Sequence, residues 1–523
     1  MLYLSTGIIL YLGVFMDEKV IFSKPSTENL SANTDQTSPA SMSESELIPP
    51  VSRAQPTGFR LEVPNSVLKP DPSTGIPPSS IPPPLPPKPP LSSFFSQWGK
   101  IIGIVFGIGV VLALVIFLIL PRIGKKAVDA PVVLTYWGLF EEKRVMDTII
   151  AEFHVQHPTI SVNFIQKDVK EYRRSLVTQL ENGSGPDIFR FHNSWVGMMK
   201  NYLSPMSAEV ITADEIKKNY YPVIQQDLIR SGALYGVPLQ IDTLALFVNN
   251  DLFEAGGNNV PKTWDEFVRV SKDLVVKDQD GKIKTAGAGI GTYDNINHAS
   301  DIIALLMAQN GVSFSDFSST KTNASQALEF YTAFANNEGS VWDSTLDPAL
   351  IAFAKGNLAM YFGYSWDLFA LKAMSPDLRF SVAPAPNLPG RQKALASYWV
   401  EGVSSKSKHQ KEAQLFMQFL AKKETLQKLY TETAKTRSFG QLYPRSDLAQ
   451  SLSSNGFLAP FLSQASYATS SYFISDTYDD GINQEMNVYL GNAVRGSTSG
   501  TSSQTAVDTL DQGVNQLLTK YGR

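Results

Sequence analysis

Cysteine is absent from the 523 residues of this chain. Its absence excludes disulfides, thiolate metal ligands, a cysteine nucleophile and a lipid attached to an N-terminal cysteine. A strong excess of charge is also missing, because the formal net charge is only −4, so the composition indicates no nucleic-acid partner. A chain without disulfides needs a large core, and an apolar share of 43% is sufficient to form one.

Motifs of common enzyme families are scarce as well. The sequence has no Gly-x-Ser-x-Gly elbow of a hydrolase, and the glycine-rich run 287–292 lacks the Gly-Lys-Ser/Thr ending of a phosphate loop. The five histidines are scattered, and the pair His154 and His157 has no third metal ligand nearby. We therefore expect no catalytic residue, no metal and no cofactor.

Proline is concentrated at the N-terminal end, where 17 of the 32 prolines lie in the first 100 residues. Proline fixes φ and lacks an amide hydrogen, and the residues around these prolines include few bulky apolar side chains. A disordered, proline-rich region is therefore predicted over residues 1–100.

An apolar run follows this region. Residues 101–120 contain no charged side chain, and twenty helical residues span about 30 Å, the hydrocarbon thickness of a bilayer. A single transmembrane helix is therefore predicted over residues 101–121. Two basic residues flank its N-terminal end and three flank its C-terminal end, a count that alone would put the C-terminal side in the cytoplasm. A large C-terminal domain can translocate despite such a small bias, so the flanking charges leave the orientation open.

From residue 130 onward, strands and helices are predicted to alternate. Short β-rich runs at 132–137, 160–164 and 187–191 are separated by helical patterns at 142–154 and 172–180. This βαβαβ order indicates a parallel sheet, and ligands of such sheets bind beyond the carboxyl ends of the strands.

Several strings in this region resemble the pattern of the family 1 extracellular solute-binding proteins, which include the maltose-type binding proteins. They occur in the family's order over roughly residues 130–450. The strings are Tyr136-Trp137-Gly138, Phe153 with His157-Pro158, Gly183-Ser184-Gly185-Pro186-Asp187, Leu234-Tyr235-Gly236-Val237-Pro238, Val260-Pro261-Lys262-Thr263-Trp264-Asp265-Glu266-Phe267, and Gly356-Asn357-Leu358-Ala359-Met360 followed by Gly363-Tyr364-Ser365-Trp366.

The resemblance implies an α/β fold of two lobes, a type II periplasmic-binding-protein-like clamp that closes on its ligand at a hinge. By analogy, the chain crosses between the lobes near 240–243 and again near 382–386. The expected domains are lobe one at 130–241 with 385–435, and lobe two at 242–384 with 436–523.

The resemblance also implies where a ligand binds. A sugar has C–H faces that stack on aromatic rings and hydroxyls that need amide, hydroxyl or carboxylate partners. Trp137, Trp366 and Trp399 are expected to stack, and Asn193 and Asp242 to hydrogen-bond hydroxyls. Each aromatic residue could instead belong to the core or to an interface. The complete expected site at the cleft mouth is Trp137, His192, Asn193, Trp195, Asp242, Tyr364, Trp366, Tyr398 and Trp399.

The function implied by this family is that of an extracytoplasmic receptor, not an enzyme. It would bind a sugar or a similar small polar solute reversibly and transfer it to the permease of an ABC importer. We expect a single-pass protein of the cell membrane with its folded region on the extracytoplasmic side. A membrane-anchored sensor and a carbohydrate-active enzyme that uses the same cleft are the alternatives, and the sequence does not identify the ligand.

Overall fold

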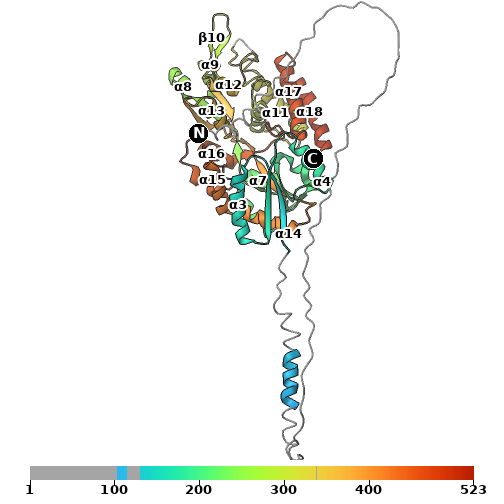
Figure 1. Ribbon diagram of the computed structural model, residues 1–523. Helices are drawn as coiled ribbons and strands as arrows, with labels where there is room; N and C mark the ends of the chain where they lie inside the picture. The colour runs from blue at the N-terminus through green and yellow to red at the C-terminus, as the bar shows by residue number, and fades with distance from the viewer. Residues whose placement is uncertain (1–102, 115–129, 337–338, 523) are drawn as a thin grey trace, which may run out of the picture. The chain divides into compact units, whose positions relative to one another are not determined.

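The computed structural model describes residues 103–114, 130–336 and 339–522 (Figure 1). The predicted disordered region 1–100 lies outside these residues. Of the predicted membrane segment 101–121, residues 103–114 form a helix with eight large apolar side chains exposed, whereas 115–121 fall outside the described part. Among the described helices, none combines the length and the apolar character needed to cross a membrane. This short helix and the folded region belong to separate compact units.

The first sheet of the folded region contains the predicted βαβαβ unit. Its strands run in the order β2 (Ile160–Gln166), β1 (Val132–Gly138), β3 (Ile188–His192), β15 (Trp399–Ser404) and β4 (Leu203–Ser204), with β7 (Val237–Pro238) also paired to β15. β1 pairs in parallel with both β2 and β3, which confirms the expected strand arrangement. β15 runs antiparallel to its three partners and so brings a distant segment of the chain into this sheet.

Helices cover this sheet because their apolar faces are buried against it. The helices are α3 (Lys143–Gln156), α4 (Tyr172–Glu181), α5 (Val196–Met199), α6 (Ala213–Asn219), α7 (Pro222–Leu228), α14 (Gln410–Leu420) and α15 (Lys423–Ala434). α3 packs against β2 and α15, while α14 packs against β1 and β15. Phe153 on α3 meets Phe416 on α14 edge to face, with ring centroids 4.9 Å apart, so aromatic contacts join the two helices.

The folded region contains a second sheet that is separate from the first. It has the order β12 (Met360–Gly363), β9 (Ala245–Asn249) and β13 (Phe380–Pro384), with both outer strands antiparallel to β9. All five residues of β9 are buried, as expected for a central strand covered on both faces. The helices around it are α8 (Asn250–Gly256), α9 (Trp264–Leu274), α10 (Ala299–Gln309), α11 (Lys321–Thr332), α12 (Ala349–Ala354) and α13 (Asp367–Met374).

The start of α9 explains one of the family-like strings. Thr263 caps the helix: its hydroxyl accepts from the backbone N–H of Glu266, and the Glu266 carboxylate accepts from the backbone N–H of Thr263. The Trp264 ring stacks on Phe362 of β12, and its Nε1 donates to Gln309 of α10 over 2.7 Å. This string therefore fixes α9 and α10 to the second sheet.

A third, small sheet joins the segments that run between the other two. Its order is β16 (Ala468–Thr469), β14 (Ala394–Ser397) and β8 (Asp242–Thr243). The chain leaves β8 directly for β9 of the second sheet, and it leaves β14 for β15 of the first. The return to the first sheet thus comes after β14, later in the chain than the 382–386 segment; the predicted lobe boundaries themselves stay a prediction.

The remaining elements complete the folded region. α16 (Ala459–Gln464) packs against β13 and β8, and α17 (Ile482–Thr498) lies beside α18 (Ser503–Lys520) as an antiparallel pair (Figure 1). That pair packs on α11. Two short hairpins are formed by β5 (Ile229–Arg230) with β6 (Ala233–Leu234), and by β10 (Val276–Lys277) with β11 (Ile283–Thr285).

Candidate functional site

Three of the expected site residues meet at one edge of the first sheet. Trp399 is the first residue of β15 and pairs with His192, the last residue of β3. The Trp399 ring lies edge-on to His192 and to Trp195, with ring centroids 5.2 Å apart in each case. Phe140 approaches Trp399 from the loop after β1 at 5.4 Å. These four residues are called the Trp399 cluster, and they lie where the carboxyl ends of the parallel strands β1 and β3 meet the start of the antiparallel β15.

His192 in this cluster is neutral. Its Nδ1 hydrogen-bonds with the Ser194 hydroxyl at 2.7 Å, and its Nε2 hydrogen-bonds with the Ser397 hydroxyl at 3.1 Å. Burial lowers the pKa of His192 to about 3, because no carboxylate faces it to offset the loss of hydration. In this structure both ring nitrogens of the uncharged His192 are therefore used within the protein, by Ser194 and Ser397.

Asn193 and Tyr398 hydrogen-bond to a buried carboxylate. Asp227 on α7 accepts from the Asn193 amide at 2.9 Å and from the Tyr398 hydroxyl at 2.7 Å. The Ser470 hydroxyl donates to the same carboxylate oxygen. Burial raises the pKa of Asp227, although these three donors oppose the shift. The polar groups of both expected site residues are thus directed into the protein in this structure.

A second aromatic group lies beside the second sheet. The rings of Tyr364 and Trp366 are stacked 4.3 Å apart, and the His298 ring lies edge-on to Tyr364 at 5.2 Å. Tyr364 donates its hydroxyl to Asp301 over 2.7 Å and is fully buried, while Trp366 remains partly accessible. Tyr364, Trp366 and His298 are called the Trp366 cluster. Trp366 is therefore the only one of these three residues that is not fully buried.

The His298 ring in this cluster carries a positive charge. Burial alone would lower its pKa, but Asp367 at 2.9 Å and Asp476 at 3.6 Å outweigh burial and raise it to about 9. The Asp367 carboxylate also accepts from the Tyr361 hydroxyl and from the backbone N–H of Tyr364. This network sets the backbone of the loop that carries Trp366.

Asp242 connects the third sheet to the same loop. Its carboxylate accepts from both the backbone N–H and the hydroxyl of Ser365, and from the backbone N–H of Thr243 at 2.8 Å. Burial raises the pKa of Asp242 to about 7 in spite of these donors. In this structure the carboxylate that was expected to bind sugar hydroxyls instead holds the residue beside Trp366.

Trp137 is separate from both clusters. It lies near the end of β1, is 5% exposed, and has the Lys167 ammonium 3.8 Å above its ring centroid. Among the ring contacts of the described residues, none joins Trp137 to Trp366 or Trp399. The cation covers one face of the ring.

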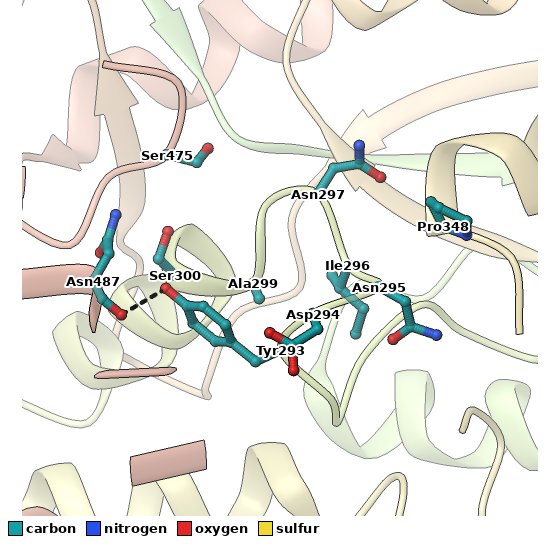
Figure 2. A pocket seen from close by; sticks show the side chains of 10 residues that line it. All are labelled: Tyr293, Asp294, Asn295, Ile296, Asn297, Ala299, Ser300, Pro348, Ser475 and Asn487. Atoms are coloured by element: carbon teal, nitrogen blue, oxygen red, sulfur yellow. Dashed lines mark hydrogen bonds between the residues drawn. The ribbon is translucent and has the colours of Figure 1, made fainter. Parts of the chain in front are cut away.

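A pocket of about 290 Å³ lies beside the Trp366 cluster, and none of the nine expected site residues lines it (Figure 2). Its wall combines amide and hydroxyl groups with Pro348 and Ile296. It connects to the cluster through Ser475, whose hydroxyl hydrogen-bonds with His298 Nδ1 at 2.9 Å. The lining residues are Tyr293, Asp294, Asn295, Ile296, Asn297, Ala299, Ser300, Pro348, Ser475 and Asn487.

One side chain of the pocket wall has a polar atom without a hydrogen-bond partner among the described residues. The side-chain oxygen of Asn487 is buried and accepts no hydrogen bond, although its amide donates to Ile474 O. Asp294 is already paired with Arg495 at 2.7 Å, so it adds little free charge. The only sequence signal for this pocket wall was the run of polar residues before α10. Ser475 and Asn487 come from the C-terminal segment, where no sequence pattern indicated a binding site.

A buried ion network was also missed. Arg190 on β3 donates to Glu141 and, over 2.7 Å from Nε, to Glu401 on β15. The three side chains are at most 2% exposed. Glu141 also accepts from Gln441 at 3.2 Å. Because Glu141 follows Phe140, this network holds the loop that contributes Phe140 to the Trp399 cluster.

Comparison with known proteins agrees with this architecture. A solved cyclo/maltodextrin-binding protein complexed with maltotetraose superposes with a TM-score of 0.61 at 19% identity, covering 75% of this chain and 99% of that chain. The fold is therefore the mixed α/β fold of two-lobed periplasmic sugar-binding proteins. A model of the family described as bacterial extracellular solute-binding protein matches residues 148–440, more than half of the chain. The chain belongs to this family, and the expectation of a solute-binding receptor is confirmed.

Curated relatives are similar in sequence to this chain. The multiple sugar-binding protein of Streptococcus mutans is 25% identical over 358 residues, which cover 64% of this chain and 81% of the relative. A probable amino-acid ABC transporter periplasmic-binding protein of Sinorhizobium fredii is 24% identical over 302 residues, covering 54% and 67%. Relatives of this chain thus carry names with different solute classes.

Proposed function

We propose that the chain binds a sugar or a similar polyhydroxyl solute between its two sheet-centred halves and delivers it to the permease of an ABC importer. The observation that carries this proposal is the partly exposed Trp366, whose ring lies 6.4 Å from His298, together with a pocket of amides and hydroxyls that His298 contacts through Ser475. Stacked aromatic rings bind the C–H faces of a sugar, and such amides and hydroxyls bind its hydroxyls. The Trp399 cluster supplies further rings from the first sheet. The name of the Streptococcus mutans relative supports the same solute class.

The proposed role is reversible binding without covalent chemistry. Glycosidases need two carboxyl groups that face the scissile bond. Here the buried carboxylates near the Trp366 cluster are engaged inside the protein: Asp301 by Tyr364, Asp367 by His298, and Asp242 by Ser365. Carboxylates held in this way support a positioning role for these residues. The nine expected site residues are proposed as the ligand surface or its immediate support, with Trp366 as the principal stacking ring.

A screen of solutes tests the proposed ligand class. The purified full chain is heated with a panel of sugars and polyols, and with amino acids as the competing class. A solute at 100 times its Kd should stabilise the folded state by about 2.7 kcal/mol, which raises the melting temperature measurably. A shift with a saccharide and none with amino acids is the expected result. A shift with amino acids alone would contradict the proposed sugar ligand but not the proposed role as a solute-binding receptor.

We also propose that the folded region lies on the extracytoplasmic side, tethered by residues 101–121. Support comes from the charge-free run 101–120 and from the exposed apolar side chains of its helical part, for example 74% exposure at Phe106. Protease added to intact cells that express the full chain should degrade the region from residue 130. Protection of that region until the cells are lysed would rule out this location.

A further inference from the structure

The first turn of α17 is hydrogen-bonded to the 3₁₀ turn that follows β3 of the first sheet. Asn483 is completely buried, and its side-chain oxygen accepts from the Ser194 hydroxyl at 2.9 Å and from Trp195 Nε1 at 3.1 Å. Its amide donates to the backbone oxygen of Tyr472 over 2.9 Å. One side chain thus meets the 3₁₀ turn Asn193–Trp195, which supplies Trp195 to the Trp399 cluster.

The folded region has one half around the first sheet and one half around the second sheet. The packing of α17 places it in the half around the second sheet. It contacts α10, α11 and α18, and Tyr293, which lies just before α10, donates to the backbone oxygen of Asn487 over 2.9 Å. α10 is in turn held to β12 through the hydrogen bond between Gln309 and Trp264. The bonds of Asn483 to Ser194 and Trp195 therefore run between the two halves.

A second contact between the halves lies next to the first. Arg173 on α4 donates to the backbone oxygens of Asp479 and Asp480, the latter over 2.8 Å. The Asp479 carboxylate accepts from the backbone N–H of Asn483 and so caps the start of α17. Asp480 and two other residues of this connection have φ between 44° and 57°, a left-handed conformation that surrounding contacts must hold in place.

We propose that Asn483 is a positioning residue that latches the two halves in the closed state, and that Arg173 makes a second contact between the halves beside it. Opening of the clamp has to break the bonds from Ser194 and Trp195 to Asn483. The latch raises the fraction of ligand-free molecules that are closed. The apparent affinity for the ligand is proportional to that fraction. It also keeps Trp195 oriented within the Trp399 cluster. The effect on affinity rests on the proposed function, whereas the effect on closure does not.

The absence of cysteine allows a direct measurement of closure. V155C on α3 and V276C on β10 introduce two unique labelling sites at positions that are 81% and 55% exposed. The two elements lie at opposite ends of the folded region (Figure 1). Pulsed electron paramagnetic resonance on the spin-labelled full chain then reports the distance between the halves without any ligand.

The expected result is a short distance in the parent and a longer second population in N483A. The ratio of closed to open molecules should fall about tenfold, the equivalent of about 1.4 kcal/mol, because the two buried hydrogen bonds that run between the halves are lost. N492A is the matched control, since Asn492 lies on the same helix, is exposed and contacts Arg495. It should leave the distance unchanged.

A distance distribution in N483A identical to that of the parent would overturn the proposal. If N483A does not fold, S194A decides, because it removes one of the two bonds and leaves Asn483 in place. A longer population in S194A supports the latch, and none overturns it. Since no ligand is present, failure of the solute screen and failure of the latch are separate results.

Discussion

Replacement of Arg190 by methionine is expected to lower the free energy of unfolding by about 3–5 kcal/mol, the range for breaking a buried ion pair from one side. Arg190 is 1% exposed and lies between Glu141 and Glu401, which are equally buried. Without the guanidinium, two carboxylates remain in a medium that hydrates them poorly. Urea unfolding of the full chain at neutral pH measures the loss.

The loss should depend on pH. In the parent, burial raises the pKa of Glu401 from 4.5 to about 7, although Arg190 lowers it. A carboxyl with a higher pKa in the folded state contributes stability that declines as pH rises from about 4.5 through 7. In R190M the Glu401 carboxyl loses the guanidinium that lowers its pKa, so a proton neutralises it more readily at pH 5 than at pH 8. The deficit should therefore be larger at pH 8.

A matched surface arginine provides the control. Arg379 also bridges two carboxylates, Asp251 and Glu254, but all three side chains are more than half exposed. R379M should cost no more than about 1 kcal/mol, because exposed ion pairs are screened by water. Equal losses for R190M and R379M would show that burial of the triad does not govern its stability.

Local patterns were sufficient to predict the first helices of the folded region. The helical pattern at 142–154 is α3 (Lys143–Gln156), and the pattern at 172–180 is α4 (Tyr172–Glu181). The signals there are short-range: apolar residues at helical spacing and, after α3, a proline at position 158. The parallel pairing of β1 with β2 and β3 followed from the same alternation, whereas the antiparallel β15, β4 and β7 were not predicted.

The site was predicted less completely because its contacts join distant parts of the chain. His192, Trp195 and Trp399 were expected at the cleft, and β3 pairing with β15 brings them together. Asp242 was expected to face a ligand, but its partner Ser365 lies in the loop after β12, 123 positions away. Side-chain direction at such junctions depends on packing that no local pattern records.

The C-terminal segment is the clearest example of this limit. Asn483 bonds to Trp195 across 288 positions, and Ser475 bonds to His298 across 177. Both residues are small polar side chains without a distinctive neighbour pattern. The loop before α17 combines left-handed backbone at three residues with bonds to both halves, so its role depends on tertiary structure alone.

Replacement of Trp366 by alanine is expected to weaken binding of the solute found in the screen about a hundredfold, or about 2.8 kcal/mol. Losses of this size are typical of tryptophans at the centre of a binding surface. The ring is stacked on Tyr364 at 4.3 Å and is the accessible member of its cluster. Isothermal titration with the full chain measures the change in Kd.

The control variant W366F keeps an aromatic face on the Tyr364 ring and should lose less than tenfold. The melting temperature of ligand-free W366A must stay close to that of the parent, because Tyr364 remains bonded to Asp301 and the loop remains held by Asp367 and Asp242. An unchanged Kd in a well-folded W366A would indicate that the binding surface lies at the Trp399 cluster instead. A large loss in W366A and a small one in W366F would instead show that stacking on this ring, rather than support of the loop, provides the affinity.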